Sequence, residues 1–411
     1  MDAAAGPDGF AGRGPAAASD LALARVMRAE NARLVGALAA RIGNFDVAEE
    51  AVADAVAEAV REWRRRGIPP NPAAWLSTAA RHNALDRLRR ERVYRDKLAL
   101  LAPEAPPTEA DDRLPLLFGC CHPAIAPAAQ LALTLRAVCG VTTAQIARVT
   151  ITPEATIAQR IVRAKRKIAA AGVPLRVPEG AELAERLDTV LTVVSAMYTQ
   201  AHLMPGGDAS TDRDVADDAI WLARVVSDAL PREPEARGLV ALLLFHRARD
   251  DARDNDGELV LLDAQDRTAW DQVLLAEGRA QLERCAAAKR PGRFQLQAAI
   301  AACHADAGTP VDTDWLQILT LYDVLLRWDD SPVVRLNRAV ALGRVEGPAA
   351  ALAEVDALRE ALAGFHLWHA VRAEMLRGLG RDREATDADL QALELTANEA
   401  ERRLLVARAG L

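Results

Sequence analysis

A capped helical segment, a tight break and a second helical segment follow one another in residues 142–168, and this order constrains the fold most. Thr142 followed by Gln145 is a capping box, which begins a helix by satisfying backbone amides at both positions. The helical pattern breaks at the sequence TITP, and Pro153 suits the first turn of a new helix. These features predict a helix-turn-helix motif. An ordinary two-helix corner of an all-α protein is the alternative.

The second helix of this motif has one apolar face and one polar, basic face. Ile157 and Ile161 lie on the face that we expect to be buried. In a DNA-binding helix-turn-helix, the second helix presents side chains to base edges in the major groove, while lysine and arginine neutralise phosphates. The candidate DNA-contacting residues are Thr156, Gln159, Arg160, Arg163, Lys165, Arg166 and Lys167.

Composition favours helices along the rest of the chain. Hydrophobic residues make up 51% of it and aromatic residues only 4%. Much of the apolar content is Ala, Leu and Val, and with many Arg and Glu this mixture favours helix over strand, so we predict an all-α fold.

Residues 1–176 carry a net charge of +7 and residues 177–411 a net charge of −14. This asymmetry indicates one part that meets a polyanion and one that does not; a chance fluctuation on solvated helices is the alternative.

Residues 21–97 form a helical block with a basic end. Within this block, Asp46 is the predicted N-cap of one helix. Trp75, His82 and Asn83 lie close to the basic segment, and aromatic and amide groups beside a basic helix suit contact with unstacked single-stranded bases. The alternative is a solvated helix face with Trp75 in the core.

Three further segments carry no predicted chemistry. Residues 1–20 are expected to be disordered, and the Pro-rich, acidic residues 98–113 to form a linker. In the stretch FGCCHP, Cys120, Cys121 and His122 are consecutive, and consecutive helical side chains point about 100° apart. They cannot easily converge on a metal or form a nucleophile–base pair. We therefore expect no enzymatic activity, no cofactor and no metal, with both cysteines as small buried hydrophobic residues; a redox role for the thiols is the alternative.

Nothing in the sequence indicates secretion or insertion into a membrane. The N-terminus lacks the basic start and apolar middle of a signal peptide. No apolar run reaches the roughly 20 residues needed to cross a bilayer. The five cysteines are scattered and do not form a disulfide framework. We therefore predict a cytoplasmic protein that does not contact a membrane.

The acidic region 181–411 is helical throughout and partly repetitive. Its end has the Leu-Gly-Arg turn and the alternation of small and large residues that are typical of tetratricopeptide repeats. Residues 315–342 have a similar helix–turn–helix character. We predict a tetratricopeptide-like helical domain, with a non-repetitive helical bundle as the alternative.

A basic helical block, a linker and a helix-turn-helix together resemble the extracytoplasmic-function sigma factors, which are two-domain members of the sigma-70 family of bacterial transcription initiation factors. The segment DVAEEAVADAVAEAV (46–60) is similar to the region 2 helix that docks on RNA polymerase. PAAWLSTAARHNALDRLRRERV (72–93) is similar to the segment that reads the −10 promoter element, and residues 130–168 are similar to region 4, which reads the −35 element. The acidic remainder resembles the tetratricopeptide-like extension of one subgroup.

The resemblance implies a role for each matching segment. Region 2 would span residues 21–97 and region 4 residues 114–173, with the seven residues named above contacting the −35 element. The residues implied to contact the −10 element are Trp75, Arg81, Asn83, Asp86, Arg87, Arg89 and Arg90. The residues implied to dock on core polymerase are Asp46, Glu49, Glu50 and Asp54.

The resemblance implies a sigma factor that binds core RNA polymerase and promoter DNA. The C-terminal extension would regulate it, through a regulatory protein or ligand or by packing against the basic domains. A helix-turn-helix regulator with a helical sensor domain is the alternative function, but it leaves residues 46–93 unexplained.

The sequence departs from the family pattern at three places. Ala53 replaces a usual Gln of the docking helix, and residues 198–202 replace an expected Asn-Glu-Gly segment. Ile151 replaces a usual Gly in the turn of the helix-turn-helix. Because Gly adopts positive φ cheaply, we expect this turn to be shaped differently or to be looser.

Overall fold

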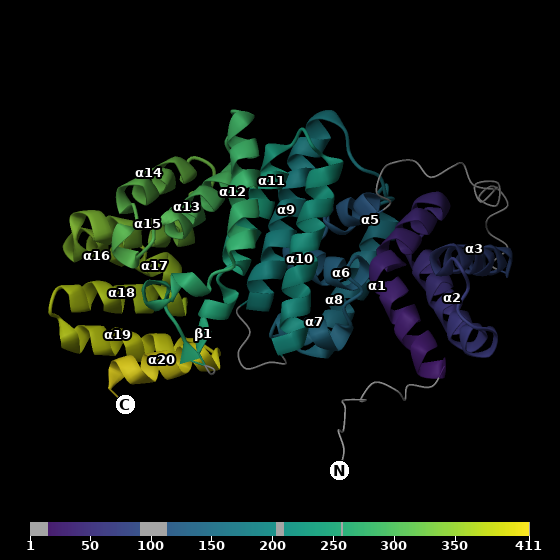
Figure 1. Ribbon diagram of the computed structural model, residues 1–411, viewed down its shortest axis with the longest axis horizontal. Helices are drawn as coiled ribbons and strands as arrows, with labels where there is room; N and C mark the ends of the chain where they lie inside the picture. Colours follow the sequence, from purple (N-terminus) through teal and green to yellow (C-terminus); the bar gives the residue numbers. More distant parts are fainter. Residues whose placement is uncertain (1–14, 91–112, 203–208, 256–257, 411) are drawn as a thin grey trace, which may run out of the picture. The chain divides into compact units, whose positions relative to one another are not determined.

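The computed structural model describes residues 15–90, 113–202, 209–255 and 258–410, and these are helical almost throughout (Figure 1). The described residues contain one two-stranded antiparallel ladder, β1 (Asp254–Asn255) with β2 (Glu258–Leu259). The predicted all-α fold is confirmed. Residues 15–20 of the predicted disordered N-terminus are helical, so that expectation is wrong for them, while residues 1–14 lie outside the described residues. The predicted linker, residues 98–113, lies outside them except for Arg113. The chain forms two compact units that divide between Val193 and Val194.

The N-terminal unit begins with α1 (Pro15–Ile42), α2 (Phe45–Arg66) and α3 (Pro72–Arg90), which pack on one another. Asn44 rather than Asp46 is the N-cap of α2, and its side chain accepts a backbone amide of the first turn. The predicted cap is therefore wrong by two residues. Asn and Asp are similarly good caps, so local propensity alone does not choose between them.

Small side chains allow these three helices to approach closely. Buried alanines follow α2 at helical spacing, and Leu76, Ala80, Ala84 and Leu88 form one buried stripe along α3. A stripe of this kind commits one side of each helix to the core. The basic and polar residues of α3 lie on the rest of its surface, and Asn83 and Arg87 among them contact α2 beside this stripe.

The same unit continues with α5 (Arg113–Cys120), α6 (Pro127–Ala137), α7 (Thr143–Val149) and α8 (Glu154–Ala170). The predicted capping box is present, because the Thr142 side chain accepts the Gln145 amide while the Gln145 side chain accepts the Thr142 amide. The predicted helix-turn-helix is therefore formed by α7 and α8.

Buried side chains from both helices hold this motif together. Ile146 and Val149 come from α7, and Ile157 and Ile161 come from α8. The two predicted inward-facing residues of α8 are therefore buried, as expected. The charged side of α8 faces away from this core.

The turn between α7 and α8 adopts a conformation that usually belongs to glycine. Ile151 has a φ of 47°, and its side chain is 65% exposed. The amides of Ile151 and Thr152 donate to the carbonyls of Arg148 and Ala147 at 3.0 and 2.9 Å. The expectation of a differently shaped or looser turn is wrong, because the backbone hydrogen bonds hold the left-handed conformation without a glycine.

The C-terminal unit is a succession of helices joined by short connections (Figure 1). Successive helices pack against each other, as in the pairs α14 with α15 and α18 with α19. Its elements are the end of α9 (Gly180–His202), then α10 (Ala209–Ala229), α11 (Pro234–Arg247), η2 (Asp250–Ala252), η3 (Leu262–Ala264), η4 (Arg267–Ala269), α12 (Gln272–Ala287), α13 (Arg293–Asp306), η5 (Pro310–Asp312), α14 (Trp315–Leu325), α15 (Pro332–Glu346), α16 (Pro348–Ala357), α17 (Arg359–Leu362), α18 (His366–Gly378), α19 (Asp382–Leu395) and α20 (Glu399–Ala409).

Replacing Ile151 by Gly is expected to stabilise the helix-turn-helix. The left-handed conformation costs an ordinary residue about 1–2 kcal/mol, and the greater chain entropy of Gly offsets about half of the gain. Hydrogen exchange of the α7 and α8 amides in the full-length chain should become slower. Ile151→Val is the matched control, because it keeps a β-branched side chain at the strained position and should not slow exchange. Unchanged or faster exchange in Ile151→Gly would contradict this explanation.

Candidate nucleic-acid interface

The exposed side of α8 carries most of the residues that were predicted to contact the −35 element. Gln159, Arg163, Arg166 and Lys167 are exposed, while Thr156 and Arg160 are half-buried. The opposite side is buried through Ile157, Ile161, Ala164 and Ile168. The apolar stripe therefore determines which side of the helix is available to a partner. This side presents one amide and several cations, a combination that suits a nucleic acid.

Lys165 differs from its neighbours because it is engaged within the protein. Its side chain is only 14% exposed, and its ammonium donates to the Glu49 carboxylate. The ammonium also lies 4.0 Å from Asp46 and 5.1 Å from the centre of the Phe45 ring. The start of α2 and the middle of α8 are thereby joined.

The predicted −10 residues of α3 lie in three different environments. Trp75 is half-buried and packs edge-on against Trp63, with ring centres 5.8 Å apart. Asn83 is half-buried, and its side-chain amide lies 3.5 Å from the Ala51 carbonyl of α2. Arg81 is half-buried and Asp86 is exposed. The side chains of Arg89 and Arg90 lie outside the described part of the chain.

Arg87 bridges α3 to α2. Its guanidinium donates to Asp54 at 2.8 and 3.2 Å and also to Glu50. Glu50 and Asp54 are half or more exposed, whereas Arg87 is 32% exposed. Such exposed pairs contribute only about 0–1 kcal/mol each. They therefore set the positions of side chains more than they stabilise the fold.

Each predicted docking carboxylate thus lies beside a predicted DNA-contacting cation. Asp46 and Glu49 face Lys165, and Glu50 and Asp54 face Arg87. Sequence patterns placed the two groups on separate functional surfaces. The structure instead pairs the carboxylates with the cations. A partner that bound the carboxylates would therefore also free the cations, and the reverse.

The FGCCHP stretch is built for packing. Cys120 and Cys121 are buried, and the Cys121 sulfur lies 3.7 Å from the Thr134 hydroxyl. Burial raises the pKa of Cys120 well above its usual range and raises the pKa of Cys121 to about 12. Burial also lowers the pKa of His122, whose Nδ1 accepts the Ala124 amide. Protonated, enclosed thiols are poor nucleophiles, which disfavours the redox alternative.

Two residues that sequence reasoning missed hold this stretch in place. Arg186 of α9 is buried, and its guanidinium donates to the Phe118 carbonyl. A side-chain carbon at Gly119 would lie 2.3 Å from a Leu175 methyl group, so a larger residue there would require the Leu175 side chain to move. Arg186 pairs with Glu182 four residues earlier on the same helix at 3.3 Å, and no sequence pattern marked it as a buried cation. Among the described residues, no group of three metal-ligating side chains occurs and no helix could span a bilayer.

A short capped helix, a tight turn and a second helix with a cationic exposed side define a helix-turn-helix protein of the DNA-binding type. Three family models match the chain. Sigma-70 region 2 matches residues 27–93, and Sigma-70 region 4 matches residues 116–168. A family of unknown function, DUF6596, matches residues 186–286.

The chain is also similar along most of its length to an uncharacterized protein of Rhizobium meliloti (strain 1021). The two are 40% identical over 385 residues, which cover 89% of this chain and 90% of that protein. No solved structure matches the chain. The chain belongs to the sigma-70 family, as an extracytoplasmic-function-like sigma factor with a C-terminal extension, and such sigma factors act in transcription initiation.

Replacing Glu49 by Gln is expected to strengthen binding of the full-length chain to duplex DNA at low salt. The change releases Lys165 for one further phosphate contact, so the slope of log affinity against log salt should steepen by about 0.9. Fluorescence anisotropy with a labelled duplex measures both quantities. Glu58→Gln removes the same charge from the same helix and is the matched control. Equal salt slopes for the two variants would contradict a role for Glu49 in holding Lys165.

Alkylation should distinguish buried packing cysteines from reactive ones. At about pH 8, Cys120 and Cys121 should react with iodoacetamide far more slowly in the native protein than after unfolding, because reaction requires an exposed thiolate. Mass spectrometry of peptides gives the rate for each residue. Rapid native labelling of either cysteine would revive the redox alternative.

Proposed function

We propose that this sigma factor binds core RNA polymerase through both of its sigma regions and directs initiation at specific promoters. The observation that carries the proposal is the exposed amide and cationic side of α8, held outward by a buried isoleucine stripe. The matches to region 2 and region 4 support it.

The −35 element would be read by α8 in the major groove. Of the predicted contact residues, Gln159 and Arg163 are the exposed ones nearest its beginning and would contact bases, with half-buried Arg160 beside them. Arg166 and Lys167 would neutralise phosphates. Each good bidentate contact to a base gives about 1–3 kcal/mol of discrimination against the wrong base.

The −10 element would be opened by α3. Asp86 is exposed, and Arg81, Asn83 and Trp75 are half-buried, so each leaves part of its surface available to a partner. Capture of an unstacked base on such a surface provides roughly 1–3 kcal/mol. A few captured bases would therefore favour a melted promoter. Since Arg87 is paired with Glu50 and Asp54, it would first have to exchange partners.

Core polymerase would dock on the acidic side of α2, where Asp46, Glu49, Glu50 and Asp54 lie. Docking would exchange internal ion pairs for pairs with the polymerase. The more exposed pairs of Arg87 contribute about 0–1 kcal/mol each, so their exchange costs little, whereas the more buried pair of Lys165 with Glu49 would need replacement by a partner's cation. It would leave Lys165 and Arg87 available to promoter DNA.

The C-terminal extension would regulate the factor rather than contact promoter DNA. Residues 177–411 carry a net charge of −14, which repels phosphate. Its helix pairs provide surfaces for a regulatory protein or ligand. No step of this function forms or breaks a covalent bond in the protein itself.

Run-off transcription with purified core polymerase tests the proposal, using the full-length chain and the DNA upstream of its own gene. The chain should bind core polymerase and produce a defined start site. Arg163→Ala should reduce initiation by about tenfold or more, because it removes a base contact.

Arg335→Ala is the matched control, since Arg335 is an exposed arginine of the C-terminal unit that pairs with Asp330. It should leave initiation unchanged. A chain that neither binds core polymerase nor directs any start site would refute the proposal. Promoter binding without polymerase binding would favour the alternative of a conventional helix-turn-helix regulator.

A further inference from the structure

The C-terminal unit contains a cavity of about 740 Å³. This size lies within the range of small-molecule sites in proteins. Much of its lining is apolar, contributed by α11, η4, α13, α14 and α15. The apolar lining residues include Leu242, Phe245, Trp270, Ile300, Leu325 and Val334.

A single arginine supplies positive charge to this lining. The Arg249 guanidinium lies 3.4 Å from the Nδ1 of His246. Among the described residues, no carboxylate forms an ion pair with Arg249. The neighbouring Asp250 accepts from Arg247 and Tyr198 instead. The one carboxylate in the cavity lining, Asp329, accepts the Ser331 amide.

The cation is therefore half-buried without a carboxylate in ion-pair contact, although Asp329 lies in the same lining and Asp250 lies near enough to attract it. Burial lowers the pKa of Arg249 to about 10, which leaves it protonated at neutral pH. Burial also lowers the pKa of His246 to about 3 and that of His304 to about 4, so both rings are neutral there. An enclosed charge without a partner is costly, and an anion in the cavity would relieve that cost.

Unused hydrogen-bonding groups lie in the same lining. The Nε1 of Trp270 and the Nδ1 of His304 are buried and have no hydrogen-bond partner among the described residues. Trp270 is 4% exposed. Buried polar atoms are nearly always satisfied in folded proteins, so these two atoms mark an imperfectly satisfied region beside the cavity, although neither atom is exposed to it.

We propose that this cavity binds a small organic anion, with its carboxylate or phosphate group paired to Arg249 and an apolar body against the surrounding aliphatic and aromatic side chains. Guanidinium recognises both kinds of anionic group through paired hydrogen bonds. The extension is then the receptor domain of the sigma factor, and its ligand is a small molecule.

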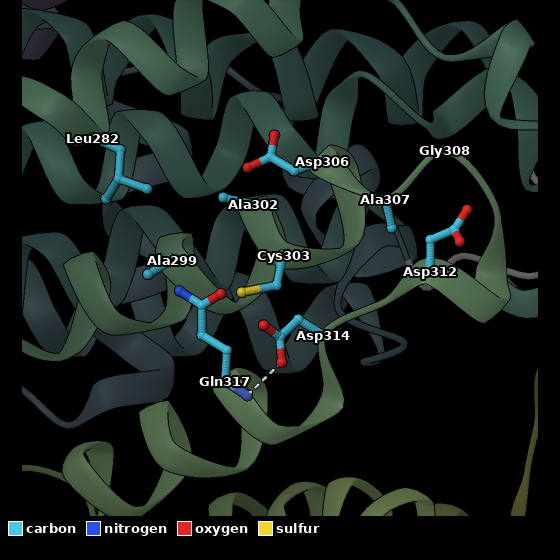
Figure 2. Close-up of a pocket in the computed structure, with 10 residues that line it drawn as sticks. All are labelled: Leu282, Ala299, Ala302, Cys303, Asp306, Ala307, Gly308, Asp312, Asp314 and Gln317. Carbon is cyan, nitrogen blue, oxygen red and sulfur yellow. Dashed lines mark hydrogen bonds between the residues drawn. The ribbon is translucent and has the colours of Figure 1, made fainter.

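A second cavity, of about 430 Å³, lacks these features (Figure 2). Three aspartates line it, but each carboxylate is used locally. Asp306 accepts from Arg279 at 2.7 Å, Asp312 from the Thr309 amide at 3.1 Å and Asp314 from the Gln317 amide at 2.9 Å. Because each carboxylate already accepts a hydrogen bond from the protein, this acidic cluster does not indicate a bound ligand.

Isothermal titration of the full-length chain with matched probes tests the proposal. The probes are 1-naphthoate, 1-naphthyl phosphate and the neutral 1-naphthylmethanol, which share one apolar body. At least one anion should bind about 10- to 100-fold more tightly than the alcohol, as expected for hydrogen bonds to a charged group. The preferred anion identifies the ligand as a carboxylate or a phosphate.

Arg249→Met should abolish this preference, because it removes the charge while keeping an apolar side chain of similar length. It should not lower the thermal stability, since a buried cation is replaced by a hydrophobic residue. Arg224→Met is the matched control, because Arg224 is an exposed arginine of the same unit paired with Glu277, and it should keep the preference.

Equal binding of the acids and the alcohol to the wild-type chain, or no binding of either anion, would overturn the proposal. Unchanged anion binding by a folded Arg249→Met would also overturn it. Should that variant fail to fold, the comparison of probes on the wild-type chain still decides the matter. Since no polymerase takes part, this result is independent of the run-off experiment.

Discussion

The shared core of α7 and α8 is the constraint on which the candidate interface depends. Ile146 and Val149 meet Ile157 and Ile161 in a small space, and no other side of α8 could enter it. This packing fixes the rotation of α8 about its own axis. Gln159 and Arg163 are exposed for that reason rather than because of any property of their own. Loss of one isoleucine would thus alter the interface without touching a predicted DNA contact.

A second organising feature is the mutual neutralisation of the groups that would meet polymerase and DNA. Lys165 and Arg87 each face two carboxylates of α2. The exposed pairs of Arg87 are weak enough to be exchanged, whereas Lys165 is more buried and is held more firmly. In the free protein, the carboxylates of α2 therefore cover Lys165 and Arg87, which are part of the cationic surface. A basic partner that bound these carboxylates, or an acidic partner that bound the two cations, would separate the pairs.

Local sequence signals predicted the motif but not its long-range contacts. The capping box and Pro153 act within a few residues, so the positions of α7 and α8 could be read directly. The pair of Lys165 with Glu49 joins residues 116 positions apart, which no periodicity reports. The cavity around Arg249 is similarly invisible, because its lining comes from several separate elements. The N-cap of α2 was missed because Asn44 and Asp46 have similar propensities.

The left-handed turn at Ile151 also bears on how motifs of this kind are defined. Its conformation is maintained by backbone hydrogen bonds to two carbonyls of α7, so the side chain at that position is a preference and not a requirement. A consensus pattern that treated the glycine as essential would miss this turn, although the region 4 model still matches the segment. A definition written in dihedral angles would recognise the same turn at once. For helix-turn-helix proteins with divergent turns, backbone conformation is the more faithful criterion of membership.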